Sequence, residues 1–175
     1  MMKSLLLRLA ILGGAVAGCV GVLPAQAGPA EVALLANYIG EWSGSSVLKG
    51  GDAPEAFSCR LSVGKGNKAK INYAGRCTLV NMNLSVSGTI AYDDATRTYQ
   101  AIMGSNAGFK GTAVGRVKGG TITFDLAQKE QDRAGNAVRL GAQIILINNA
   151  SITVNYQVEF NDSGKVLTAT VPFAK

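Results

Sequence analysis

Apolar and polar residues alternate with a period of two along most of this chain. In residues 84–92 every second position is apolar or glycine, and serine, threonine or alanine stands between. Such a period predicts strands with one buried face, because successive side chains of a strand point to opposite sides. Glycine, asparagine and aspartate mark the turns. The pattern predicts ten strands, over 41–48, 56–64, 70–79, 84–92, 98–104, 109–117, 121–128, 137–147, 152–160 and 165–173.

A short helix is predicted before these strands. Pro29 suits the first turn of a helix. Val32, Leu35 and Ile39 then lie on one side of a helix of about two turns, which Gly40 ends.

The connections between the predicted strands are at most eight residues long. Links of this length join antiparallel neighbours, so we expect a meander in which each strand pairs with the next. Closing the meander into a barrel removes its two exposed edges. The sequence therefore predicts an all-β fold, a ten-stranded antiparallel up-and-down (meander) β-barrel with a short N-terminal helix, in one domain over residues 28–175.

Residues 1–27 have the pattern of a secretory signal peptide. Lys3 and Arg8 form a basic start, residues 9–23 are apolar, and small residues end the segment at 24–27. An alternative cleavage precedes Cys19, because residues 16–19 resemble the bacterial lipobox, in which the cysteine becomes the lipidated first residue. The first cut predicts a periplasmic or secreted protein, and the second predicts a protein anchored to the bacterial envelope by lipid.

Cys59 and Cys77 remain after either cut, and an oxidising compartment favours a disulfide between them. A hairpin centred on Lys68 places position 59 opposite 77, 61 opposite 75 and 63 opposite 73. Both cysteines then share the apolar face of the two strands. We expect a structural staple, because the chain has no Cys-x-x-Cys motif of the redox proteins.

Composition excludes several classes of site. The chain has no histidine, which removes Ser-His-Asp catalysis, zinc bound by histidine and haem held by a proximal histidine. Seventeen Lys and Arg residues face eleven Asp and Glu residues without a basic run, so nucleic acid is not an expected partner. Asp93 and Asp94 fit a turn, and no loop has the spacing of a calcium site. We expect no metal, no cofactor and no catalytic residue.

The segment Gly40-Glu41-Trp42, at the start of the first strand, resembles the calycin superfamily of lipocalins and fatty-acid-binding proteins, in particular small bacterial exported lipocalin-like proteins. In that superfamily the tryptophan plugs one end of the barrel, which implies this role for Trp42. Three features are missing: the Thr-Asp-Tyr-like motif of lipocalins, the late arginine that packs on the tryptophan, and the Arg-x-Tyr that holds a fatty acid. The resemblance therefore implies the barrel without a particular ligand site.

Every second residue of each predicted strand faces the lumen, and we call these positions the lumen parity. Its ligand-binding candidates are Tyr73, Tyr92, Tyr99, Met103, Phe124 and Tyr156. Small residues share this parity: Gly75, Gly88, Ala101, Gly111, Ala113, Gly115 and Ala142. They have two interpretations, a ligand cavity or a filled core with tight curvature. Four arginines fall on the opposite parity or in turns and are expected in solvent: Arg76, Arg97, Arg116 and Arg139.

These features predict an exported, periplasmic module that binds a small apolar or amphipathic ligand without catalysis. The first alternative is an envelope interaction protein or inhibitor with a filled core. It rests on the run 144–147, which is apolar on both faces, so that Ile145 and Ile147 offer a surface to a partner or a second copy. The second alternative is an outer-membrane β-barrel, whose strands alternate with the same period. Otherwise we expect membrane attachment only through lipid on Cys19.

Overall fold

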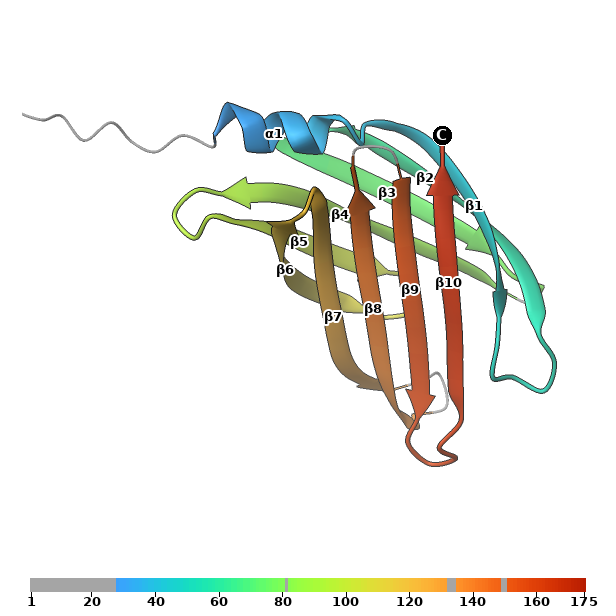
Figure 1. Cartoon of the computed structure of the whole chain (residues 1–175). Helices are drawn as coiled ribbons and strands as arrows, with labels where there is room; N and C mark the ends of the chain where they lie inside the picture. Colours follow the sequence, from blue (N-terminus) through green and yellow to red (C-terminus); the bar gives the residue numbers. More distant parts are fainter. Residues whose placement is uncertain (1–27, 81, 132–134, 149–150) are drawn as a thin grey trace, which may run out of the picture.

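The structure, a computed structural model, describes residues 28–80, 82–131, 135–148 and 151–175 (Figure 1). The predicted leader, with its cleavage site at 24–27 and with Cys19, lies outside these residues. One helix and ten strands follow along the chain: α1 Pro29–Ala36, β1 Gly40–Leu48, β2 Glu55–Lys65, β3 Lys70–Thr78, β4 Asn83–Asp93, β5 Thr98–Ser105, β6 Lys110–Lys118, β7 Thr121–Gln131, β8 Ala137–Ile147, β9 Ser151–Phe160 and β10 Val166–Ala174.

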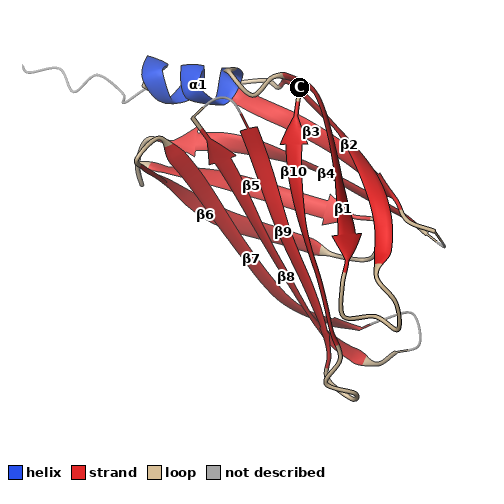
Figure 2. Ribbon diagram, turned by 45° about the vertical axis from the view of Figure 1, so that its right-hand side comes forward, coloured by secondary structure: helices blue, strands red, loops and turns tan. Residues whose placement is uncertain are grey.

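Each strand pairs antiparallel with its neighbour in the chain, and β1 pairs with β10, so the sheet closes into a barrel. The predicted fold class is confirmed. The helix α1 lies across one end of the barrel, which we call the helix end (Figure 2). The opposite, distal end carries the connections that follow β1, β3, β5, β7 and β9. Along every strand, one parity faces the lumen and the other forms the outer wall.

Two predicted boundaries are wrong. The helix α1 ends at Ala36, and Gly40 is the first residue of β1 instead of the end of the helix. Strand β7 continues through Gln131, because residues 129–131 pair with residues 137–139 of β8. The polar side chains of 129–131 indicated a loop, but the ladder keeps them in the sheet at the distal rim.

Cys59 and Cys77 form the predicted disulfide between β2 and β3. The two cysteines are register partners, and Val63 pairs with Tyr73, as the hairpin centred on Lys68 requires. Cys59 is 2% exposed, so the bond lies on the lumen side of the wall. Disulfides persist in oxidising compartments, and this bond is therefore typical of a protein outside the cytosol.

The seam between β1 and β10 is interrupted in its middle. The two strands pair at Gly44 and again at Lys49. Pro172 of β10 lies in the interval and has no amide hydrogen to donate to the ladder. Its carbonyl oxygen leaves no room for a Cβ on Gly44, and the hydroxyl of Ser46 donates to the Thr170 carbonyl at 2.5 Å. A glycine and a serine thus close the barrel where proline breaks the regular pairing.

We expect the double variant Cys59→Ala/Cys77→Ala to lose about 3 kcal/mol of unfolding free energy, because the disulfide closes a loop of 18 residues. Urea denaturation followed by circular dichroism measures the loss. Reduction of the wild-type protein should produce the same loss, and reductant should leave the double variant unchanged. Equal stability of the oxidised wild type and the double variant would contradict the staple.

Candidate functional site

Trp42 lies at the helix end of the lumen and is 2% exposed. Its indole Nε1 donates a hydrogen bond of 2.8 Å to the carbonyl of Tyr38, and the two rings stack with centroids 6.3 Å apart. Lys175 Nζ lies 4.9 Å from the centroid of the indole and donates to the Asn37 carbonyl. A lysine therefore packs on the tryptophan, at the place where the resemblance to lipocalins implies an arginine.

The lumen is filled next to Trp42. Tyr99 is 1% exposed, and Phe124 is fully buried. The ring of Phe124 occupies the space where a Cβ of Gly115 would stand, and the hydroxyl of Tyr73 does the same at Gly88. In this half of the barrel the small residues accommodate bulky neighbours, which is the filled-core interpretation.

The lumen is more open toward the distal end. Several apolar side chains of the lumen parity are only half-buried there, although Leu126, Val138 and Val158 are buried. We define the distal lumen as these half-buried side chains together with one polar neighbour: Phe57, Leu84, Gln128, Leu140, Ala142 and Tyr156.

Two polar groups belong to the distal lumen. Gln128 Oε1 is the one buried side-chain oxygen or nitrogen without a hydrogen bond among the described residues. The hydroxyl of Tyr156 has no hydrogen-bond partner within the described part of the chain. Burial raises the pKa of Tyr156, so its hydroxyl keeps its proton at neutral pH and can donate. Buried polar groups are normally paired, so the unpaired Gln128 acceptor, with the Tyr156 hydroxyl in the same apolar lumen, indicates a place for a ligand.

The register places both groups on the lumen side of the wall. Leu126, Ala142 and Tyr156 form one row across β7, β8 and β9. Gln128 stands two positions beyond Leu126 on the same face of β7 and pairs with Leu140. Gln128 therefore lies two strands and one row away from Tyr156, and its Oε1 lies beside Gly111 of β6.

Three other predicted ligand contacts are tyrosines of the helix-end half. The Tyr73 hydroxyl donates to the Ile102 carbonyl at 3.2 Å, and burial raises the pKa of Tyr73. The Tyr99 hydroxyl donates to the Glu31 carbonyl of α1 at 3.4 Å, and burial, with a smaller effect of the Glu31 charge, raises the pKa of Tyr99 to about 12. The Tyr92 ring packs against Tyr99 with centroids 4.9 Å apart. These phenols connect barrel elements to each other.

The remaining predicted contacts, Met103 and Phe124, are 8% and 0% exposed and belong to the core. Of the six predicted ligand contacts, Tyr156 is the one that the structure places in the distal lumen. Sequence reasoning missed Gln128. The available signal was a polar residue on the apolar parity of the predicted strand 121–128.

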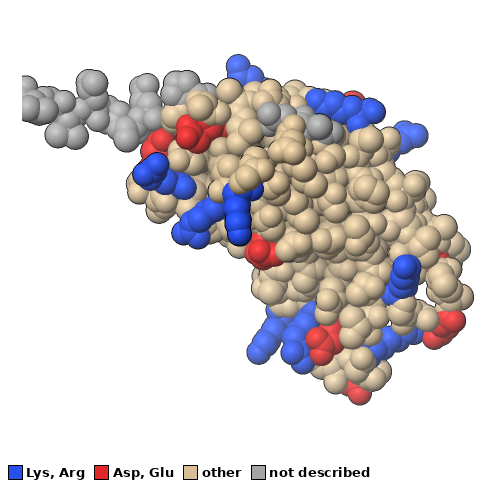
Figure 3. Space-filling model, in the orientation of Figure 1, with Lys and Arg blue, Asp and Glu red and all other residues tan. Residues whose placement is uncertain are grey.

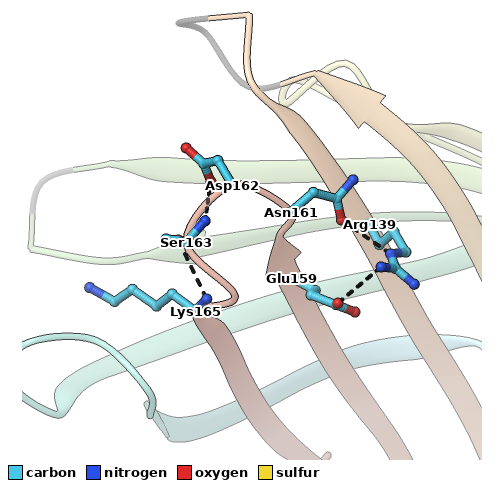
Figure 4. A network of polar contacts seen from close by, with 6 residues as sticks. All are labelled: Arg139, Glu159, Asn161, Asp162, Ser163 and Lys165. Atoms are coloured by element: carbon cyan, nitrogen blue, oxygen red, sulfur yellow. Dashed lines mark hydrogen bonds and ion pairs between the residues drawn. The ribbon is translucent and has the colours of Figure 1, made fainter.

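Polar contacts hold the distal rim beside β8, β9 and β10 (Figure 4). Arg139 forms an ion pair of 3.2 Å with Glu159 and donates to Asn161 Oδ1 at 3.1 Å. Lys165 forms an ion pair of 3.0 Å with Asp52, in the connection between β1 and β2. Exposed pairs of this kind contribute little stability, about 1 kcal/mol or less each. They link neighbouring strands and turns at the distal rim.

Comparisons with known proteins agree with this architecture. Neither the family models nor the curated proteins match the sequence. Among solved structures, Rv2717c from M. tuberculosis is similar with a TM-score of 0.58 and 16% identity, over 85% of this chain and 98% of that one. The S-type phycobiliprotein lyase CPES from Guillardia theta is similar with a TM-score of 0.51 and 11% identity, over 81% and 89%.

Both solved structures are ten-stranded barrels of the calycin-like kind, and likeness at such low identity concerns the fold alone. The shared barrel fold agrees with the resemblance of Gly40-Glu41-Trp42 to the calycin superfamily. It does not indicate a ligand for this chain.

We expect Tyr73→Phe and Tyr156→Phe to differ in stability. The first variant loses the hydrogen bond to the Ile102 carbonyl and should lower the free energy of unfolding by about 1 kcal/mol. The second removes a hydroxyl without a partner among the described residues and should change the free energy by less than about 0.5 kcal/mol. Urea denaturation measures both. Equal losses would contradict the described difference between the two phenols.

Proposed function

We propose that this protein binds a small, mainly apolar ligand with a hydrogen-bonding head group in the distal lumen, and releases it unchanged. The buried Gln128 Oε1 carries the proposal, because a buried acceptor left without a partner costs about 1–3 kcal/mol. A ligand that donates a hydrogen bond there recovers this cost. The half-buried apolar side chains around it would take the body of the ligand.

The polar groups define the head group. Gln128 Oε1 accepts, so the ligand must carry an O–H or N–H donor. The Tyr156 hydroxyl is protonated at neutral pH, and burial raises its pKa further, so it can donate to an oxygen of the same head group. A long-chain alcohol or a primary amide has both features. Neither side chain supplies a base or nucleophile at neutral pH, which supports binding over catalysis.

Export supports the same proposal. The Cys59–Cys77 disulfide is suited to an oxidising compartment, and residues 1–27 have the pattern of a signal peptide. We propose that the protein is periplasmic, with the lipid-anchored form at Cys19 as the alternative. A periplasmic carrier of apolar molecules needs a lumen that shields its ligand from water.

The two other hypotheses have less support. Ile145 and Ile147 point outward but are half-buried, and Ile145 stands between Thr123 and Thr153. They therefore expose less apolar surface than the sequence suggested for a partner or a second copy. The described outer wall is mainly serine, threonine, asparagine, glutamine and charged residues, unlike the apolar band that an outer-membrane barrel presents to lipid.

We expect the wild-type protein to bind neutral fluorescent probes such as N-phenyl-1-naphthylamine, and hexadecanol to displace them. The variant Ala142→Leu places a larger side chain between Tyr156 and Leu126 and should weaken probe binding at least about tenfold. Gly141→Leu is the matched control, because Gly141 points to the outer wall and has room for a Cβ. Fluorescence titration measures all three proteins.

Gln128→Leu separates the head group from the body of the ligand. Hexadecanol should lose affinity about tenfold in this variant, while an alkane of equal length should not. Failure of every neutral probe to bind the wild type, or equal probe binding by Ala142→Leu, would overturn the proposal.

A further inference from the structure

A hollow of about 550 Å³ opens on the outer wall, on the side of the strands that faces away from the lumen. It crosses β1 to β6. We call it the outer trough and define it by its outward-pointing residues: Glu41, Arg60, Ser62, Ala74, Arg76, Ser85, Ser87, Gly104 and Lys110. Its volume is in the range of small-molecule sites.

The floor of the outer trough consists of small residues in register. Ser62, Ala74, Ser87 and Gly104 are successive partners across β2, β3, β4 and β5. The same row continues to Glu41 at one end and to Lys110 at the other. The trough therefore runs across the strands, with a charged side chain at each end.

Two arginines form one wall. Arg60 and Arg76 are direct register partners on β2 and β3, which brings their Cβ atoms to about 5 Å from each other. Like charges in this position destabilise a sheet. Within the described residues, neither guanidinium has a hydrogen bond or an ion pair. Arg139 on β8 differs, since it faces Glu159 and pairs with it.

The opposite wall of the barrel has no comparable surplus of charge. Figure 3 shows the face over β7 to β10, where the middle carries few charged side chains. Its row of polar side chains bonds to itself: Gln143 donates to Asp125, Asn155 to Gln143 and Thr170 to Asn155, at 2.7 to 2.9 Å. Unpaired arginines side by side are thus a feature of the outer trough.

We propose that the outer trough binds a phosphate group between Arg60 and Arg76. Three basic side chains and one acidic side chain line it, and the Glu41 carboxylate already accepts the Ser62 hydroxyl. The surplus of two positive charges matches a phosphate monoester, which carries nearly two negative charges at neutral pH. A carboxylate carries one negative charge and would balance only one of the two arginines. The guanidinium fork suits phosphate oxygens, and the hydroxyls of Ser85 and Ser87 add donors.

This site is separate from the distal lumen. The side chains of Arg60 and Arg76 point outward, whereas the adjacent Cys59 and Leu61 point into the barrel. A phosphate in the outer trough therefore leaves the lumen free. The two proposals fail independently, because one is tested with neutral probes and the other with anions.

Isothermal titration calorimetry with glycerol phosphate and with acetate at low salt tests the site, together with sedimentation of phosphatidic acid and phosphatidylcholine vesicles. The variants are Arg60→Thr and Arg76→Thr. Arg116→Thr is the matched control: it removes the same charge from the outer wall of β6, outside the trough. Thermal unfolding of each protein is the second measurement.

We expect Arg60→Thr and Arg76→Thr to lose at least tenfold in phosphate affinity, and Arg116→Thr to lose less than twofold. The melting temperature of the two trough variants should stay equal or rise, because each relieves the repulsion between the arginines. Affinity for glycerol phosphate indicates a soluble ligand, and binding confined to phosphatidic acid vesicles indicates a lipid head group. Either supports the phosphate site. Equal affinity for acetate, no binding in either arm, or equal losses in all three variants would overturn it.

Discussion

Closure of the sheet forces every side chain of the ten strands either into the lumen or onto the outer wall. Because β1 pairs with β10, the sheet has no free edge, and it separates an inside from an outside along its whole circumference. A single register then decides the surroundings of each residue. Cys59 and Cys77 meet on the inside, and one position further along the same strands Arg60 and Arg76 meet on the outside. Both proposed binding sites are consequences of this alternation.

Within the lumen, the helix end sets the difference between the two halves. Trp42, Tyr38 and Lys175 occupy that end, and the rings of Tyr99 and Phe124 fill the space beside them. At the distal end Phe109 is buried as well, but several inward side chains, among them Phe57 and Leu140, are only half-buried. A ligand that enters from the distal end would meet this apolar surface, with Gln128 and Tyr156 on the same wall.

The alternation of apolar and polar residues was enough to predict the strands, the barrel and the register of the disulfide hairpin. It could not predict how far along the lumen each inward side chain lies, or what that side chain contacts there. Tyr73 and Tyr156 have the same parity, yet Tyr73 reaches across Gly88 to a backbone carbonyl and Tyr156 has a free hydroxyl within the described residues. The contact of Lys175 with Trp42 joins residues that are far apart in the sequence, so no local pattern indicates it. The pair Arg60 and Arg76 was within reach of the sequence, because the register that faces 59 with 77 also faces 60 with 76.

The disulfide explains how the sheet tolerates that pair. Two like charges on adjacent strands cost about 1 kcal/mol or less at an exposed position, whereas the bond between Cys59 and Cys77, one residue away on both strands, contributes about 3 kcal/mol. The bond therefore outweighs the repulsion at the place where it acts, and it holds β2 and β3 in the register that keeps the guanidinium groups side by side. A covalent link on the lumen side thus maintains an electrostatically unfavourable arrangement on the outer wall, which an anion then stabilises.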